Sequence, residues 1–304
     1  FLKLPPETVV CLLPIVAGFV GADAVAAALA TRMDESPSLR IEVDIGMNGA
    51  GVLGSRDHLW ACSAPARPAL EGAQIRHGMR AAIGAIDRVW VADGDLRLHA
   101  IGDGAAQGLC GSGLVDAVAA LLDLGVIDWT GLIDVEARDR LPAPFRSRVE
   151  MRGEEGALLL ARVGEQGAER DLTITQDDIR QVQLCKGAIA SGVAMLQHVA
   201  SVPTERVEEL MLAGGFGNYL SVRSALRIGL IPPGLPEHRI RYVGNAAALG
   251  AQLALVSEAE RARAAVIARR IEHVSLAAHP DFETIFVECM NFPRPPLPSG
   301  ERAG

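Results

Sequence analysis

Several features that commonly reveal a protein's chemistry are scarce in this sequence. Aromatic residues make up only 4% of the 304 residues, so the hydrophobic core must be built from Ala, Val, Leu and Ile. The five cysteines lie far apart with no Cys-x-x-Cys pair. Their spacing indicates no iron–sulfur or other metal cluster, and it is typical of reduced, mostly buried thiols in a cytoplasmic protein. The Walker A lysine motif, the G-x-S-x-G elbow and the H-E-x-x-H motif are absent as well, so these common enzyme signatures give no lead.

Basic residues are fewer than acidic ones. The chain carries 29 lysines and arginines against 37 aspartates and glutamates, which gives a net charge of −8 and a pI of about 5.4. An acidic surface with no basic stripe argues against nucleic acid and anionic membranes as main partners. We therefore predict a protein that binds neither.

No uninterrupted hydrophobic run is long enough to span a bilayer. Residues 9–30 come closest, but Pro14 and several glycines break the run, and Asp23 lies near its middle, where a charge is costly. The cationic start and cleavage site of a signal peptide are also missing. We predict a buried segment up to Gly18 and then a helix from about Val20 to Thr31, with no membrane anchor.

Hydrophobic periodicity and turn signals predict an α/β fold. The order of the elements differs from the steady β-α-β-α alternation of a doubly wound fold, and it indicates a mixed sheet that begins with a meander and is covered by helices. The first two strands are joined at Asn48-Gly49, a strong hairpin signal. The predicted elements are strands at 39–45, 50–55, 58–63, 85–92 and 96–101, a helix at 113–124, weak strands near 146–152 and 156–163, a long helix capped by Thr175 and Asp178, a strand at 207–216, a short helix at 221–229, a strand at 239–243 and a helix at 245–257.

The predicted hairpin "DIGMNG" is the first candidate site. Asp44 ends a buried strand, and Gly46, Asn48 and Gly49 form the turn. Such a turn can point successive backbone N–H groups into one concavity that suits phosphate oxygens. A carboxylate at the end of the strand can hold a hydrated Mg²⁺ ion beside them, so Asp44 is our candidate for a catalytic and metal-organising residue. The alternative is an ordinary hairpin with an aspartate in its turn.

The segment "GLCGSGLVD" is the second candidate. Gly111, Ser112 and Gly113 precede a helix, whose free N–H groups and dipole favour an anion. The glycines have the order G-x-x-G-x-G, which is not the dinucleotide-binding fingerprint. Asp116 lies one turn into the helix and could either cap it electrostatically or face a metal ion, and the sequence does not choose between these.

The third candidate, "MLAGGFGNYL", has three glycines in four positions where a strand should end. Glycine is costly in regular structure and is usually kept where the backbone must approach something closely or adopt a positive φ. A strand ending in Gly214 and Gly215, with Gly217 opening the next turn, suits a planar base or a ribose lying against the backbone. The alternative is close packing between a helix and a strand.

Taken in chain order, these motifs resemble the C-terminal ATPase domain of the reductive activators of corrinoid proteins. The resemblance runs from about Leu13 to Pro293, and so many ordered matches are far more specific than any one motif. The domain belongs to the superfamily of acetate and sugar kinases, chaperone ATPases and actin, with two ribonuclease-H-like lobes and nucleotide between them. The matching segments are "DIGMNGAGVLG", "ACSAPARPALEGAQIRHGMRAAIGAI", "GLCGSGLVDAVAALLDLGVID", "TQDDIRQVQLCKGAIASGVAML", "LAGGFGNYLSVRSALRIGLIP" and "VGNAAALGAQLAL".

The resemblance implies that this chain is one α/β, actin-like lobe with a mixed sheet and flanking helices, without the first lobe of the complete domain. Because the chain also begins at Phe1 rather than Met, we expect it to be a fragment or a processed product. We divide it into a lead-in segment and helix at 1–38, the ATPase lobe at 39–258 with an inserted region at about 129–172, and a C-terminal segment at 259–304 with a disordered tail.

The resemblance also implies a function, as part of an ATP-dependent activator that supports the return of Co(II) corrinoid to Co(I) for methyl transfer. The implied cofactors are ATP and Mg²⁺, and the implied partner is the corrinoid protein of a methyltransferase system. A two-iron, two-sulfur cluster is implied only for a full-length parent. The residues implied to meet phosphate are Asp44, Gly46, Asn48 and Gly49, and those implied to meet adenosine are Gly214, Gly215, Gly217 and Asn218.

Three positions depart from the pattern of these activators. Arg67 stands where a small residue is expected. Met47 stands where threonine is expected, and Ala50 stands where glutamate is expected, so a hydroxyl and a carboxylate are missing. The departures at Met47 and Ala50 favour an alternative, a diverged non-catalytic module used for protein docking or for a homodimer. A small-molecule kinase of the same superfamily is a weaker alternative, since no acceptor site or catalytic base stands out.

Overall fold

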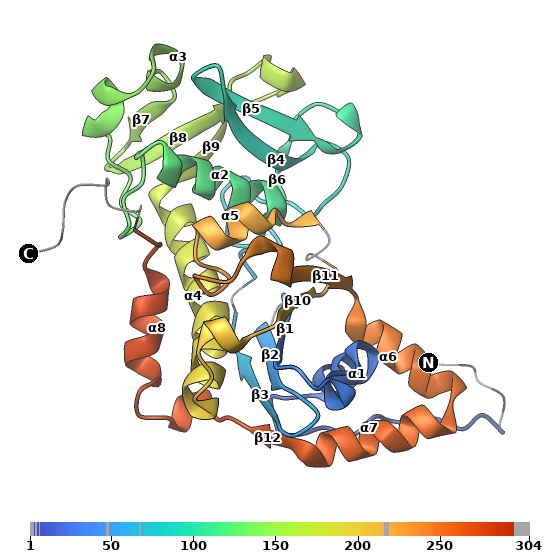
Figure 1. Ribbon diagram of the computed structural model, residues 1–304. Coiled ribbons are helices and arrows are strands. Elements are labelled where there is room, and N and C mark those ends of the chain that lie inside the picture. The colour runs from blue at the N-terminus through green and yellow to red at the C-terminus, as the bar shows by residue number, and fades with distance from the viewer. Residues whose placement is uncertain are drawn as a thin grey trace, which may run out of the picture.

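The elements of the protein form two parts, joined by one long helix (Figure 1). One part holds the largest sheet with helices on both of its faces, and the other holds two small sheets and helix α2. The fold is described from a computed structural model of the chain. It describes residues 3, 5, 7–46, 49–66, 68–215 and 219–294.

The predicted strands and helices are found in their predicted order, and the structure adds β6, α3, β9 and three elements near the C-terminus. The helices are α1 (Ala22–Thr31), α2 (Gly111–Asp123), α3 (Ala143–Arg146), α4 (Gln176–Ala200), α5 (Val222–Arg227), α6 (Ala246–Val256), α7 (Glu258–Arg270) and α8 (Phe282–Met290). The strands are β1 (Arg40–Asp44), β2 (Gly49–Gly54), β3 (Leu59–Ala64), β4 (Ala85–Ala92), β5 (Asp95–Ala100), β6 (Gly108–Leu109), β7 (Val149–Arg152), β8 (Glu155–Ala161), β9 (Leu172–Thr175), β10 (Glu209–Ala213), β11 (Ile240–Gly244) and β12 (Ile271–His273).

The six-stranded sheet has the order β11-β10-β1-β2-β3-β12. Strand β2 is antiparallel to both of its neighbours, whereas β1, β10 and β11 are parallel to one another and β12 is parallel to β3. A meander followed by two parallel strands on the far side of β1 is the ribonuclease-H-like arrangement. The predicted mixed sheet that begins with a meander is therefore confirmed.

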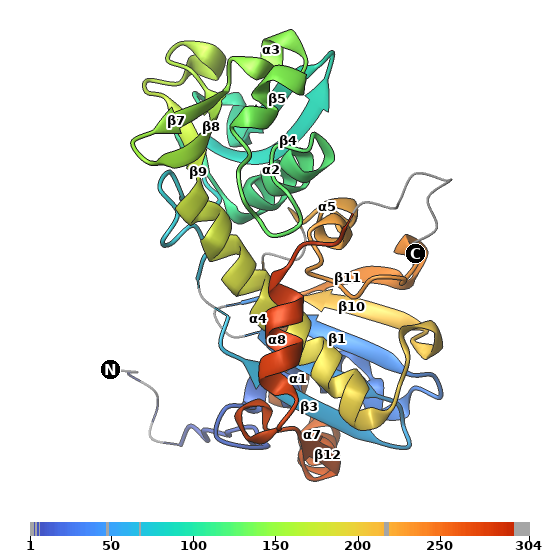
Figure 2. The same cartoon turned by 90° about the vertical axis from the view of Figure 1, so that its left-hand side faces the viewer.

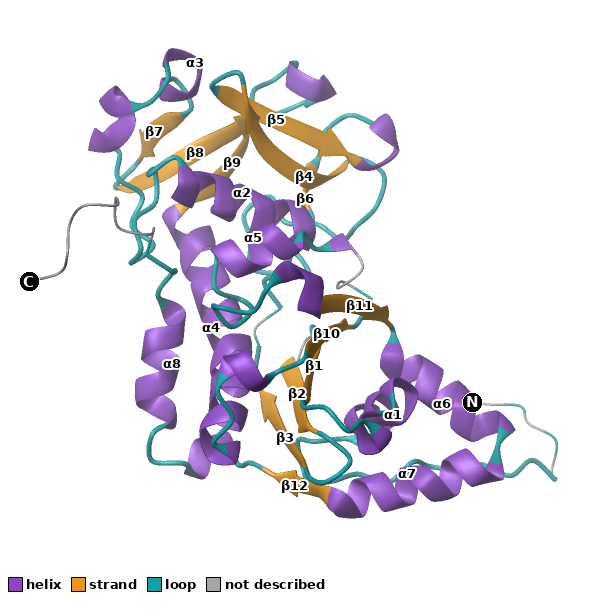
Figure 3. Cartoon of the chain, in the orientation of Figure 1, coloured by secondary structure: helices purple, strands orange, loops and turns teal. Residues whose placement is uncertain are grey.

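Helices cover both faces of this sheet (Figure 3). Helix α4 packs against β2 and β3 on one face, and α1, α6 and α7 cover the other face. Helices α1 and α6 approach so closely that a Cβ atom added to Gly250 would lie 1.9 Å from the carbonyl oxygen of Ala26. The glycine therefore sets the spacing between these two helices.

The second part contains the sheets β5-β4-β6 and β7-β8-β9. The buried Arg148 ties it together, because its guanidinium donates to Asp95 at 2.7 Å and to Glu165 at 2.9 Å. Helix α4 follows β9 directly and extends from this part along the whole six-stranded sheet, as Figure 2 shows. The region 129–172 supplies α3, β7 and β8, and its status as an insertion stays a prediction.

Helix α4 begins where the sequence predicts. The Thr175 hydroxyl accepts a hydrogen bond from the backbone N–H of Asp178, and the Asp178 carboxylate accepts one from the backbone N–H of Thr175 at 2.9 Å. This reciprocal capping satisfies two N–H groups that a helix start leaves unpaired. The strand pair around Asp93 and Gly94 is confirmed in the same way, as β4 and β5.

The prediction of a buried segment before Gly18 is wrong. Val9 is 82% exposed and Leu12 is 90% exposed, and α1 begins only at Ala22. Leu13, Val16 and Ala17 do pack against the core cluster around α1, but the extended chain has one face on the protein and the other in solvent. No helix in the described ranges is long and apolar enough to cross a membrane.

Three elements near the C-terminus escaped prediction, namely α7, β12 and α8. Helix α7 is rich in charge and buries few side chains, and β12 is only three residues long and exists because β3 offers it an edge. Their formation depends on surfaces made by earlier parts of the chain. The predicted disordered tail begins after Pro293, and from residue 295 onward it lies outside the described residues.

The cysteine prediction is confirmed in its main point. Cys62, Cys110 and Cys185 are buried and all five thiols are free, whereas Cys11 is exposed. Burial raises the pKa of the Cys62 and Cys185 thiols to about 12, so neither ionises near neutral pH.

Candidate functional site

Two of the three sequence candidates meet at one edge of the large sheet. Strands β1 and β10 are parallel neighbours, and Asp44 at the end of β1 is paired with Ala213 at the end of β10. The backbone N–H of Ile45 donates to the carbonyl of Ala213 at 3.1 Å, which holds the two chain segments together as they leave the sheet. Asp44 and Gly214 therefore lie side by side although 170 residues separate them in the sequence.

The two glycines after β10 have different surroundings. Gly214 has a φ of +96°, and a Cβ atom there would lie 2.7 Å from Asp44 Oδ1 and 2.8 Å from the carbonyl oxygen of Ile45. Both the backbone conformation and the contact require glycine at this position. No described atom lies within 4 Å of a Cβ atom added to Gly215. Gly215 therefore borders open space, as a residue lying against a ligand would.

The Asp44 carboxylate lies in a negative environment. Burial raises its pKa, and the nearby carboxylate of Asp23, in the first turn of α1, raises it further. A cation would relieve both effects, and Mg²⁺ prefers carboxylate oxygens. Ala50 is paired directly with Asp44 across the β1–β2 ladder, so the glutamate expected at this position is missing beside Asp44. The side chains present at this edge thus fit a Mg²⁺ ion through Asp44 rather than through residue 50.

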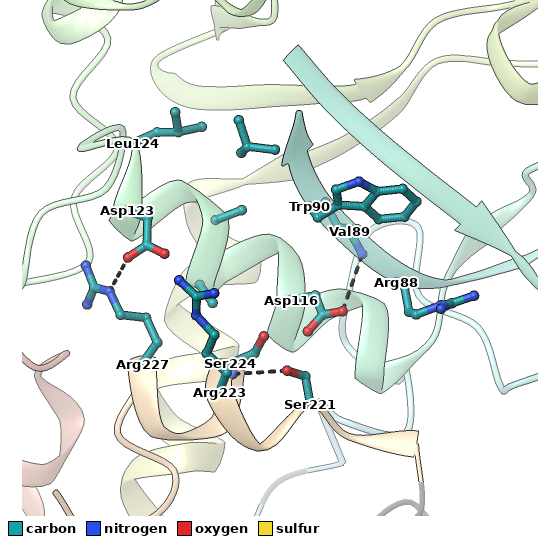
Figure 4. A pocket seen from close by; sticks show the side chains of 13 residues that line it. Arg88, Val89, Trp90, Asp116, Asp123, Leu124, Ser221, Arg223, Ser224 and Arg227 are labelled. Carbon is teal, nitrogen blue, oxygen red and sulfur yellow. Dashed lines mark hydrogen bonds and ion pairs between the residues drawn. The ribbon is translucent and has the colours of Figure 1, made fainter. Parts of the chain in front are cut away.

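A cleft of about 670 Å³ opens between α2, β4 and α5 (Figure 4). It contains side chains from both parts of the molecule, because α2 and β4 belong to the upper part of Figure 1 and α5 follows β10 of the large sheet. The residues that line it are Arg88, Val89, Trp90, Val91, Asp116, Ala119, Ala120, Asp123, Leu124, Ser221, Arg223, Ser224 and Arg227.

Asp116 is the buried acid of this cleft. Its Oδ2 accepts from the backbone N–H of Val89 at 3.4 Å, whereas its buried Oδ1 has no hydrogen-bond partner among the described residues. Burial raises the pKa of this carboxyl, and the nearby hydroxyl of Ser224 opposes the rise. A buried oxygen with no partner is costly unless a ligand or water donates to it. The hydroxyl of a sugar would be a suitable donor to Asp116 Oδ1.

Arginines and one tryptophan dominate the rest of the cleft. Arg227 donates to Asp123 at 2.5 Å, and this ion pair joins α5 to α2, whereas Arg88 and Arg223 lie on opposite sides of the opening (Figure 4). Trp90 is 45% exposed here, in a chain with only 4% aromatic residues. Guanidinium and indole faces stack on aromatic rings, and guanidinium groups attract phosphate. The cleft therefore suits an anionic ligand that carries an aromatic ring.

The cleft and the sheet edge are connected through β11. The hydroxyl of Tyr242 donates to the carbonyl of Leu220, just before α5. Burial raises the pKa of Tyr242 to about 12, and the charge of Asp116 contributes to the rise. Tyr242 is thus close enough to Asp116 to be affected by its charge, and it holds Leu220 just before α5.

Helix α2 begins at Gly111, two residues earlier than predicted, so Gly111, Ser112 and Gly113 form its first turn rather than a loop before it, and all three are buried. A Cβ atom on Gly113 would lie 2.2 Å from the carbonyl oxygen of Ile86 in β4, so this glycine permits close packing of the helix on the strand. That contact explains Gly113 without a ligand, and an anion-binding role for the three residues stays a prediction. Asn48, Gly217 and Asn218 lie outside the described residues.

Sequence reasoning found the acid of the cleft but missed its other polar residues. Arg223 and Arg227 are four residues apart and share one face of α5, and Arg88 and Trp90 are two apart and share one face of β4. That each pair shares one face of its element could have been predicted from the local sequence alone. That both pairs face Asp116 depends on how three elements pack, which no local spacing predicts.

Comparison with known proteins assigns this arrangement to a family. The family described as the C-terminal domain of RACo, the ASKHA domain, matches residues 38–299. The chain belongs to this family. The resemblance predicted from the motifs, and the α/β fold predicted with it, are both confirmed. Membership in a family of ASKHA domains supports the use of a nucleotide.

Individual relatives of this ASKHA domain are similar over most of the chain. The corrinoid activation enzyme RamQ of Eubacterium limosum is 38% identical over 95% of this chain and 48% of its own length. A [Co(II) methylated amine-specific corrinoid protein] reductase of Methanosarcina barkeri is 26% identical over 90% of this chain and 50% of its own length. The solved structure of a reductive activator for corrinoid, iron–sulfur protein superimposes with a TM-score of 0.83 at 35% identity, over 93% of this chain and 44% of that one. The chain thus spans about half the length of the relatives it matches.

Proposed function

We propose that this chain is the nucleotide-binding part of an ATP-dependent activator that returns a corrinoid protein from Co(II) to Co(I). The observation that carries the proposal is the meeting of Asp44 with Gly214 at one sheet edge. The arginine-rich cleft between α2 and α5 supports it. The names of three relatives, each of which acts on or activates a corrinoid protein, support the choice of partner.

The triphosphate of ATP would lie at the sheet edge. Backbone N–H groups of the turn after Asp44 would contact phosphate oxygens, and Asp44 would hold a Mg²⁺ ion through its water shell. Mg²⁺ would neutralise phosphate charge there, and the chain's own task is to orient the ion and the phosphates. Gly215 would lie against the nucleotide, because no described atom lies within 4 Å of a Cβ atom added there.

The nucleoside would occupy the cleft between α2 and α5. Asp116 Oδ1, which has no partner among the described residues, would accept from a ribose hydroxyl. Trp90 and Arg223 offer faces on which a purine ring can stack. Since α5 and α2 belong to different parts of the molecule, a bound nucleotide would join them, and its turnover could alter their relative position.

A second candidate function follows from Ala50, which lies opposite Asp44 in place of the expected glutamate. A site without that carboxylate could retain the fold and serve as a docking or dimerisation module that does not turn over ATP. This second candidate predicts that corrinoid binding does not depend on nucleotide.

The test is an ATP-dependence measurement. The chain is added to a Co(II) corrinoid protein with Mg–ATP and an artificial low-potential reductant, and formation of Co(I) is followed by its visible absorbance. We expect ATP to accelerate Co(I) formation, and we expect Asp44→Asn, which removes the charge but keeps the shape, to reduce that acceleration at least tenfold. A rate that ATP does not change would contradict the proposal, and complex formation without ATP dependence would support the docking module.

A further inference from the structure

Three side chains that suit a metal ion converge where α4 ends and α8 begins. His198 lies in the last turn of α4, and His279 and Asp281 immediately precede α8. One ligand atom from each lies within 4.8 Å of the others. The two segments are 81 residues apart in the sequence, so no short spacing motif announces the cluster.

The distances suit a small divalent ion. Nε2 of His198 lies 3.1 Å from Oδ2 of Asp281, and Nδ1 of His279 lies 3.8 Å from the same oxygen. Zinc bonds nitrogen and carboxylate oxygen at about 2.0–2.2 Å with tetrahedral geometry, which separates neighbouring ligand atoms by roughly 3.3–3.6 Å. The two observed distances lie on either side of that range, so a small rotation of the side chains would make room for the ion.

The local backbone also favours a cation at this place. Asp281 is the residue that precedes the first turn of α8, where aspartate usually caps the helix, yet its side chain caps none of the helix N–H groups and faces the two imidazoles instead. His198 lies at the C-terminal end of α4, where the helix dipole stabilises positive charge. The Asp281 carboxylate and the C-terminal end of α4 therefore both produce negative potential at the place where the two imidazoles meet.

The donor set selects among metals. Two imidazoles and one carboxylate suit zinc, whereas magnesium and calcium prefer oxygen ligands alone. The backbone N–H of Asp281 donates to Nδ1 of His279 at 3.3 Å, so this nitrogen carries no proton and is in the state that a metal requires. Zinc would replace that hydrogen bond. The His198 side chain is 50% exposed, which leaves a path from solvent and room for a water ligand in the fourth position.

We propose that His198, His279 and Asp281 form a zinc site that fastens α8 to the end of α4. This site lies apart from the Asp44 edge and the cleft, and it does not depend on the proposed nucleotide function. Its effect is structural, because α8 packs along α4 and the bound ion would fix the start of that contact.

The test combines zinc titration calorimetry with thermal unfolding of the metal-free chain. We expect one zinc ion per chain with micromolar or tighter affinity, a loss of affinity of at least tenfold in His198→Ala and in His279→Ala, and a zinc-dependent rise in Tm that both variants abolish. Replacement by Co²⁺ should give the visible absorption of a low-symmetry nitrogen and oxygen site, and the two variants should remove that absorption.

Two matched controls make the result specific. His58 lies 2.8 Å from the carboxylate of Glu272, so His58→Ala removes an exposed histidine that pairs with a single carboxylate. Cys11→Ser removes the exposed thiol, the other simple source of zinc binding. Both controls should bind zinc as the unaltered chain does. Absence of binding in the unaltered chain, unchanged binding in the two site variants, or loss of binding in Cys11→Ser would each overturn the proposal.

Discussion

Glu42 is a buried acid on the strand that leads to the proposed site. It lies two residues before Asp44 in β1, is only 2% exposed, and its carboxyl is 2.9 Å from the hydroxyl of Thr31. That hydroxyl also lies 2.8 Å from the carbonyl oxygen of Ala27, which can only accept. The hydroxyl can donate to Glu42 Oε2 or to the Ala27 carbonyl, and since it has one proton it cannot donate fully to both.

Burial has the largest effect on the pKa of Glu42. Burial raises it from 4.5 to about 8, the Thr31 hydroxyl opposes the rise and the charge of Asp44 adds to it. The folded protein therefore keeps the proton up to about pH 8, whereas the unfolded chain loses it near pH 4.5. The contribution to stability is fully present below pH 4.5 and is lost as the pH rises to about 8.

Replacing Glu42 by glutamine should remove this pH dependence. Between pH 4.5 and 8 the unaltered chain should lose up to about 1.4 kcal/mol of unfolding free energy per pH unit through Glu42, and Glu42→Gln should lose none of it. The variant should therefore be the more stable protein at pH 8. Urea unfolding at several pH values measures the difference. Glu258→Gln is the control, because the Glu258 side chain is 94% exposed, and pH profiles that coincide for the unaltered chain and Glu42→Gln would refute this account.

At the scale of elements, the contact between α1 and α6 depends on one glycine. Helix propensity alone would make alanine better than Gly250 by about 1 kcal/mol. The added Cβ atom, however, would lie 1.9 Å from the Ala26 carbonyl oxygen and 2.4 Å from its carbonyl carbon, and backbone atoms cannot swing aside. The two effects have opposite signs, so the sign of the measured change identifies the stronger one.

Gly250→Ala should destabilise the protein by about 3 kcal/mol, because α1 and α6 must move apart. Denaturant unfolding gives the value. Gly18→Ala is the control, since no described atom lies within 4 Å of a Cβ atom there, and it should change stability by no more than about 0.5 kcal/mol. An increase in stability for Gly250→Ala would show that propensity outweighs the contact.

Local signals predicted most elements of the fold. The hairpin signal between the paired strands β1 and β2, the capping pair Thr175 and Asp178, and Gly214 after β10 are each encoded in a few neighbouring residues. The strand-end residues Asp44 and Gly214 were found for the same reason. The exposure of the segment before α1 was not predicted. Its apolar residues suggested burial, but no other surface covers residues such as Val9 and Leu12.

Packing between distant elements determined what the sequence left undecided. The arginines of α5 and Trp90 of β4 line one cleft because α2 packs against both of these elements. The histidines before α8 and at the end of α4 came together in the same way. Helices α7 and α8 and strand β12 pack on surfaces built by earlier parts of the chain. Their own composition was therefore a weak signal of secondary structure.

The whole molecule consists of two parts that share α4 and face each other across the cleft. Helix α4 has 25 residues and is about 37 Å long, enough to support both parts. The ion pair between Arg227 and Asp123 crosses the cleft, and Arg227 also donates to the carbonyl of Pro293. A nucleotide bound from Asp44 to Trp90 would contact both parts at once, which is the central claim of the proposed function.

Titration calorimetry of Mg–ATP into the chain, compared with its Gly215→Val variant, tests that claim most directly. The unaltered chain should bind with micromolar affinity, about −8 kcal/mol. Gly215→Val should bind at least tenfold more weakly although it remains folded, because valine would fill space that no described residue occupies. The matched control Gly18→Val should bind as the unaltered chain does. No binding by the unaltered chain, or equal affinity in a folded Gly215→Val variant, would contradict the account.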